Sequence, residues 1–152
     1  MASGAELHVV EIDRDLAAQL QRLFASEPGV TIHACDALNA DLAALTGDRP
    51  FRLIGNLPYN ISTPLIFHVL KWHGLILDMH FMLQKEVVER MAAGPGGHAY
   101  GRLSVMAQYR CEVTPLFDLE PKPVRHLVIG VVNEDPKIIT LEEEKVALEK
   151  VE

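Results

Sequence analysis

The stretch FRLIGNLPYNISTPLIFHVL, residues 51–70, gives the strongest indication of the fold. The short apolar run from Pro50 to Asn56 predicts a buried strand. From Ser62 to Trp72 the apolar spacing predicts a helix, with Ser62 as its N-cap. The tetrapeptide Asn56-Leu57-Pro58-Tyr59 lies between them. The sequence therefore places an amide, a proline and an aromatic ring directly after a buried strand.

Strands and helices alternate along the rest of the chain. Such alternation predicts an α/β fold, with a mostly parallel sheet and helices on both of its faces. Further strands are predicted at residues 5–13, 29–38, 75–83, 111–119 and 125–133. Further helices are predicted at residues 14–26, 38–45, 84–93 and 102–110.

Polar side chains stand at the ends of the first three predicted strands. Glu11, Asp36 and Asn56 each lie at or near the carboxyl end of one of them. In open α/β sheets, ligands bind beyond this edge. If the three strands are neighbours, the three side chains converge on one crevice.

The charge is unevenly distributed along the 152 residues, a length that suits one domain. The formal net charge is −7, and residues 132–152 hold seven acids and three bases. That segment carries −4, which leaves −3 for residues 1–131. We therefore predict one domain at 1–131 and an acidic tail at 132–152. The balance is less basic than a free-standing RNA-binding domain would have.

Other features of the chain indicate a cytoplasmic protein without a metal site. No apolar run approaches the roughly 18–20 residues of a membrane span, and the start lacks a signal-peptide pattern. Cys35 and Cys111 are isolated, so we expect reduced thiols rather than a disulfide. The histidines are scattered, and no metal ligand set is predicted. GPGG at Gly94 follows a helix, so we expect a plain loop.

The tetrapeptide Asn56-Leu57-Pro58-Tyr59 is either a strand-end turn or a site of methyl transfer to an exocyclic amine. An amide oxygen and a backbone carbonyl can accept hydrogen bonds from the two N–H groups of adenine N6. Proline stiffens such a loop, and tyrosine offers a stacking face for an unpaired base. Its place after a buried strand and before a helix favours the second interpretation.

Four segments together resemble the KsgA-type ribosomal RNA adenine dimethyltransferases: NLPYNISTPLIFHVL, DMHFMLQKEVVERM, YGRLSVMAQY and PLFDL. The resemblance covers about residues 3–119 and implies that residues 1–131 are a partial methyltransferase catalytic domain. It implies a Rossmann-like methyltransferase fold, S-adenosylmethionine as cofactor, and dimethylation of two adjacent adenines in small-subunit ribosomal RNA. The implied partner is therefore the RNA of the immature small ribosomal subunit.

The resemblance also implies roles for individual residues. Glu11, with Ile12 beside it, is expected to hold the cofactor ribose. Asp36 is expected to accept from the cofactor adenine amine, and Ala37 to lie beside that ring. In the catalytic loop, Asn56 borders the cofactor and supplies with Leu57 the acceptors for the target N6. Pro58 stiffens this loop and Tyr59 stacks on the target base. Phe81 and Tyr100 are expected in the core.

The chain departs from the family at both ends. The family has a first strand and a glycine-rich turn before the ribose-binding acid, and a helical RNA-binding domain after the last strand. We expect these parts to be absent here, so that the cofactor pocket is incomplete and activity is reduced. Residues 128–132 could fill the vacant strand position. Two alternatives stay open: a non-catalytic RNA-binding or ribosome-assembly module, and a DNA adenine methyltransferase with a similar loop.

Overall fold

The computed structural model describes residues 5–119 and 124–131, so the predicted acidic tail lies outside the described residues. The chain divides into two compact units, Met1–Arg49 and Pro50–Glu152. The assignment of residues 1–131 to a catalytic domain stays a prediction. Within the described ranges, no helix is long and apolar enough to cross a membrane.

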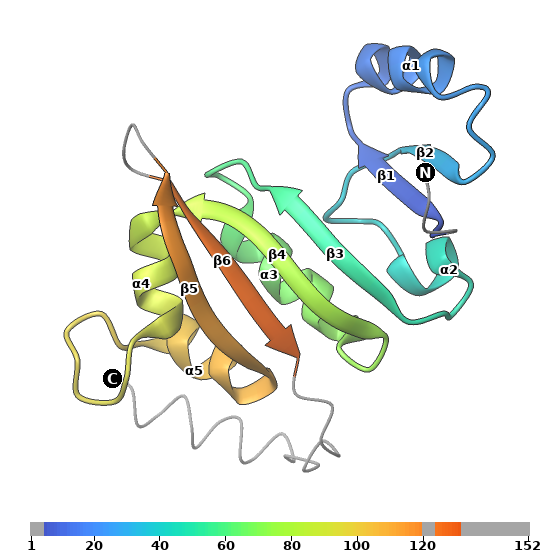
Figure 1. Ribbon diagram of the computed structural model, residues 1–152. Helices are drawn as coiled ribbons and strands as arrows, with labels where there is room; N and C mark the ends of the chain where they lie inside the picture. Colours follow the sequence, from blue (N-terminus) through green and yellow to red (C-terminus); the bar gives the residue numbers. More distant parts are fainter. Residues whose placement is uncertain (1–4, 120–123, 132–152) are drawn as a thin grey trace. The chain divides into compact units, whose positions relative to one another are not determined.

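The first unit is a strand–helix–strand motif followed by a short helix (Figure 1). Its strands pair in parallel, with Glu11 at the end of one opposite Ala34 at the end of the other. Asp13 starts the first helix, because its carboxylate accepts from the backbone N–H groups of Asp15 and Leu16. The elements are β1 (Leu7–Glu11), α1 (Arg14–Leu23), β2 (Val30–Ala34) and α2 (Leu42–Thr46).

Two helix boundaries in this unit differ from the prediction. The first helix ends at Leu23 rather than Ser26. The second begins at Leu42 rather than Leu38, because Asp41 is its N-cap and accepts from the N–H of Ala44 at 3.1 Å. The apolar residues before Asp41 belong to the turn that follows β2.

The second unit is built on a four-stranded sheet with the order β3-β4-β6-β5. Its strands are β3 (Phe51–Asn56), β4 (Ile76–Gln84), β5 (Cys111–Leu119) and β6 (Val124–Val131). β3 and β4 are parallel, whereas β6 is antiparallel to both β4 and β5. The idea that residues 128–132 fill a vacant position next to β3 is therefore wrong for the described part of this strand. Its backbone is already paired on both sides.

The first three strands are divided between the two units. β1 and β2 pair with each other in the first unit, and β3 belongs to the four-stranded sheet of the second. The predicted convergence of Glu11, Asp36 and Asn56 on one crevice consequently stays a prediction.

Helices cover one face of the four-stranded sheet, behind the strands in Figure 1. They are α3 (Ser62–Val69), continued by the 3₁₀ turn η1 (Leu70–Trp72), then α4 (Lys85–Ala92) and α5 (Arg102–Arg110). Alternate residues of β4 point into this layer, and Met79, Phe81 and Leu83 are almost completely buried. The prediction that Phe81 belongs to the core is confirmed, at 1% exposure. Tyr100 is half-buried.

The opposite face of β3 is open. Ile54 is 79% exposed there, and on the same face Arg52 forms an ion pair with Asp78 at 3.2 Å. Asn56 is also exposed and follows Ile54 by two residues, so strand alternation places it on this face. The open face thus leads to the predicted catalytic loop.

Ser62 is not the N-cap of α3, as predicted, but its first helical residue. Ile61 occupies the cap position without a side-chain cap bond. The Ser62 hydroxyl instead donates to the carbonyl of Tyr59 at 3.2 Å. The serine therefore supports the loop rather than the free end of the helix.

Cys111 illustrates how burial protects a thiol. Both cysteines are free, as predicted, and Cys111 is buried while Cys35 is half-buried. Burial raises the pKa of Cys111 to about 12, only partly offset by Arg110. The thiol is therefore protonated at neutral pH, and the thiolate is the form that reacts.

We expect iodoacetamide at pH 8 to alkylate Cys111 at least tenfold more slowly in the folded chain than in urea. Peptide mass mapping over time gives this ratio, with Cys35 as the internal comparison. Equal rates for Cys111 in folded and unfolded protein would contradict the burial of this thiol.

Candidate active site

The loop Asn56–Tyr59 is anchored to the sheet through Leu57. The Leu57 N–H donates to the carbonyl of Met82 on β4 at 3.2 Å, one step beyond the end of β3. The Leu57 side chain is 8% exposed and lies over Gly55. A Cβ atom at Gly55 would come within 2.9 Å of Leu57 Cδ2 and 3.5 Å of the Phe81 ring. The absence of a side chain at Gly55 is what allows this anchor to form.

The second half of the loop is a tight turn into α3. The carbonyl of Pro58 accepts from the N–H groups of Ile61 and Ser62, both at 3.1 Å. The carbonyl of Tyr59 accepts from the Ser62 hydroxyl. Since proline also restricts its own backbone, the turn is held at several consecutive positions.

Three groups of this fixed loop are available to a ligand. Tyr59 is 60% exposed, and Asn56 is exposed as well. Among the described residues, neither the Asn56 amide nor the Leu57 carbonyl has a hydrogen-bond partner, whereas the carbonyls of Pro58 and Tyr59 do. An anchored loop with two free acceptors beside an exposed ring suits a planar ligand that donates two hydrogen bonds.

In the first unit, Glu11 and Asp36 lie after the ends of the paired strands β1 and β2. Because these strands are parallel and in register, both acids belong to the same edge of the two-stranded sheet. One oxygen of Glu11, Oε1, accepts from the N–H of Asp13 at 2.9 Å. Its other oxygen has no hydrogen-bond donor in the described ranges. The side chain of Ile12 is largely exposed beside it.

Asp36 holds the turn that follows β2. Its Oδ1 accepts from the N–H of Leu38 at 2.9 Å, and its Oδ2 accepts from the Asn39 amide at 3.0 Å. Each carboxylate oxygen has two lone pairs, so each can accept one more hydrogen bond. Ala37 is half-buried next to it. These free acceptors suit hydroxyl and amine groups of a nucleoside.

The structure therefore groups the predicted residues in two places. Glu11, Ile12, Asp36 and Ala37 lie at one edge of the first unit, and Asn56 to Tyr59 form the loop of the second. Sequence reasoning assigned Leu57 only a backbone role and missed its side-chain anchor. The glycine just before Asn56 was the available signal. No group of three metal-type ligands occurs within the residues described.

These features define a fold class, the Rossmann-like α/β fold of S-adenosylmethionine-dependent methyltransferases, and structural comparison confirms it. A dimethyladenosine transferase from Plasmodium falciparum superposes with a TM-score of 0.74 at 25% identity, covering 94% of this chain and 54% of that one. The 23S rRNA methyltransferase ErmE gives a TM-score of 0.72 at 21% identity, covering 93% and 58%. The second likeness bears on the fold alone.

Sequence comparison then gives the family. The sequence model described as "Ribosomal RNA adenine dimethylase" matches residues 3–150, so the chain belongs to that family. Relatives named ribosomal RNA small subunit methyltransferase A include one from Marinobacter nauticus, 56% identical over 125 residues. Another, from Pseudomonas syringae pv. syringae, is 56% identical over 137 residues. The matches cover 82% and 90% of this chain, but 45% and 48% of the relatives. The chain thus spans about half the length of the curated relatives it matches.

Proposed function

We propose that the protein to which this chain belongs transfers methyl groups from S-adenosylmethionine to the N6 atoms of adjacent adenines in small-subunit ribosomal RNA. The observation that carries this proposal is the Asn56–Tyr59 loop. It is anchored to the sheet, yet it leaves two hydrogen-bond acceptors and one aromatic ring free. Membership of the ribosomal RNA adenine dimethylase family supports this proposal. The same membership does not favour the two alternatives, a DNA adenine methyltransferase and a non-catalytic RNA-binding module.

In this proposal the loop binds the target adenine. The Asn56 side-chain oxygen and the Leu57 carbonyl accept the two N6–H groups, and Tyr59 stacks on the ring. Hydrogen bonding in this geometry draws the nitrogen lone pair out of conjugation and directs it toward the methyl donor. Catalysis then rests on positioning, and the tight turn at Pro58 keeps the acceptors in place. The proton released from N6 passes to water.

The first unit supplies acceptors that fit the adenosine part of S-adenosylmethionine. The free oxygen of Glu11 suits the ribose hydroxyls, with Ile12 beside it. Asp36 suits the exocyclic amine of the adenine, and Ala37 is small enough to leave room for the ring. When bound, the cofactor supplies an electrophilic methyl group on a sulfonium. The residues described here would bind and orient it.

Calorimetry with S-adenosylmethionine tests the proposed cofactor site. We expect Asp36→Asn to weaken binding by about 10- to 150-fold, since a hydrogen bond to a charged group contributes roughly 1.5–3 kcal/mol. The asparagine side chain keeps an oxygen that can accept from the N–H of Leu38, so we expect the turn after β2 to be retained. Glu27→Ala, an exposed acid of the same unit, is the control and should bind like the unaltered chain.

Transfer of labelled methyl groups to immature small ribosomal subunits tests the proposed reaction, with duplex DNA as the comparison substrate. Mass spectrometry of the RNA should then show dimethyladenosine. A folded chain that does not bind S-adenosylmethionine, or one that methylates the DNA instead, would refute the proposal.

A further inference from the structure

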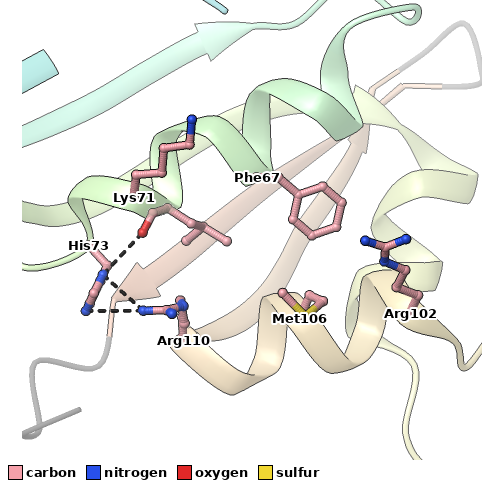
Figure 2. A pocket seen from close by; sticks show the side chains of 7 residues that line it. Phe67, Lys71, His73, Arg102, Met106 and Arg110 are labelled. Carbon is pink, nitrogen blue, oxygen red and sulfur yellow. Dashed lines mark hydrogen bonds between the residues drawn. The ribbon is translucent and has the colours of Figure 1, made fainter. Parts of the chain in front are cut away.

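A groove runs between α3–η1 and α5 in the second unit (Figure 2). Its volume is about 630 Å³. Three residues of α5 line one wall, and their spacing of four places them on one face of that helix. The lining residues are Phe67, Leu70, Lys71, His73, Arg102, Met106 and Arg110.

The groove is basic, and none of the described residues that line it is an acid. Arg102 and Arg110 stand at its two ends in Figure 2. In the part of the chain that the structure describes, the lysine and arginine side chains that form ion pairs with acids are those of Arg49, Arg52 and Lys85. None of these three lines the groove. Within the described residues, no carboxylate pairs with the two groove arginines.

Arg110 is held by an imidazole rather than by an acid. Its Nη1 lies 3.3 Å from Nδ1 and 3.5 Å from Nε2 of His73, and that Nδ1 is also 3.2 Å from the carbonyl of Leu70. The Leu70 carbonyl only accepts, so Nδ1 donates to it and Nε2 is the ring nitrogen that can accept from Arg110. A neutral imidazole in this role leaves the charge of the guanidinium in place. In Figure 2 the amine of Lys71 points away from α5, so its aliphatic stem, not its charge, faces the groove.

The middle of the groove is apolar. In Figure 2 the ring of Phe67 and the side chain of Met106 face each other between the two arginines. Both are half-buried, and Leu70, which also lines the groove, is buried. Proteins bind single-stranded nucleic acid with basic side chains that contact its phosphates and aromatic rings on which its bases stack. Two arginines on either side of an accessible phenylalanine provide both kinds of contact.

We infer that this groove binds single-stranded RNA next to the target adenine. The inference rests on the proposed function, because it takes the strand to be the one whose adenine occupies the Asn56–Tyr59 loop. That loop leads directly into α3, and Phe67 follows Ser62 by five residues, about 7.5 Å along a helix axis. Nucleotides flanking the adenine can therefore reach the groove, with phosphates at Arg102 and Arg110 and a base on Phe67.

Two charge-matched double variants test this inference. Arg102→Gln with Arg110→Gln removes both groove arginines. Arg22→Gln with Arg90→Gln removes two exposed arginines on α1 and α4 and leaves the same net charge. Fluorescence anisotropy with a labelled single-stranded 12-nucleotide RNA, over a range of salt concentrations, compares both with the unaltered chain. Thermal unfolding confirms that each variant is folded.

We expect the groove variant to bind the RNA about 5- to 30-fold more weakly near 0.15 M salt, because it loses two charge contacts, one at the exposed Arg102 and one at the half-buried Arg110. The slope of log K against log salt should fall by about 1.4, or roughly 0.7 for each lost phosphate contact. The control variant should keep the slope of the unaltered chain. Phe67→Leu should weaken binding without changing the slope, because it removes stacking and no charge.

Several results would overturn the inference. They are unchanged binding by the groove variant, an equal loss in the control variant, no RNA binding by the unaltered chain, and equal displacement of the RNA by a poly-glutamate peptide. None of them touches the cofactor site, since S-adenosylmethionine binding is measured separately. A failure of the groove is thus distinguishable from a failure of the proposed function.

Discussion

Replacing Tyr59 by alanine is expected to weaken binding of an adenine-containing RNA by about 5- to 150-fold. Stacking of one base on an aromatic side chain contributes roughly 1–3 kcal/mol. Tyr59 can provide it because its ring is 60% exposed while its backbone is held by the turn into α3. A single-stranded RNA with 2-aminopurine at the target position should show quenching on binding, and Tyr59→Ala should remove most of that quenching.

Two further variants separate stacking from other effects. Tyr59→Phe keeps the ring and should quench nearly as strongly as tyrosine. Phe117→Ala removes another exposed ring of the same unit, on β5, and should bind like the unaltered chain. If Tyr59→Ala retained the full quenching, the ring would not be the stacking surface and the proposed role of the loop would fail.

The loop was predictable from sequence because its signals are local. A strand, an amide, a proline and a helix start follow one another within the segment that ends at Ser62, and the structure shows the same order. The prediction that this strand is buried is wrong, because every second residue of β3 is exposed. Leu57 shows the limit of such reasoning. Its anchor depends on Met82 and Phe81, which are distant in sequence and become neighbours only when β3 pairs with β4.

Strand pairing was less predictable than strand positions. Alternation of strands and helices correctly indicated the parallel pairs β1–β2 and β3–β4, each of which is joined by a helix. It did not indicate where β6 inserts, because an apolar strand fits a parallel and an antiparallel neighbour equally well. The antiparallel place between β4 and β5 comes from long-range packing.

The groove could be predicted only in part from the sequence. Arg102, Met106 and Arg110 recur every four residues, which indicates one helix face but not what lies opposite. The other wall comes from α3 and η1, about thirty residues earlier in the chain. The net charge of −7 also suggested weak affinity for RNA, but a total does not show that two arginines, and no acid among the described residues, line one groove.

Replacing Phe81 by alanine is expected to reduce the free energy of unfolding of the second unit by about 3–5 kcal/mol. Phe81 lies at the centre of β4 and is 1% exposed, and truncation of a buried phenylalanine removes apolar contacts and leaves a cavity. Urea unfolding followed by fluorescence measures the loss. The chain has one tryptophan, Trp72, which belongs to this unit and reports on it directly.

Phe117→Ala is the matched control, because it removes the same atoms from an exposed position of the same sheet. Its cost should stay below about 1 kcal/mol, as for most surface substitutions. A comparable cost for the two variants would mean that Phe81 is not at the centre of the core.

The same substitution also tests whether the core positions the candidate active site. The Phe81 ring and the Leu57 side chain both fill the space above Gly55, so shortening Phe81 removes the support behind Leu57. At temperatures where Phe81→Ala is still folded, its quenching of 2-aminopurine RNA should therefore fall toward that of Tyr59→Ala. Phe81→Leu, which fills more of the space, should recover part of both stability and quenching. Full quenching by a folded Phe81→Ala variant would show that the hydrogen bond from Leu57 to Met82 and the turn at Pro58 hold the loop without the core.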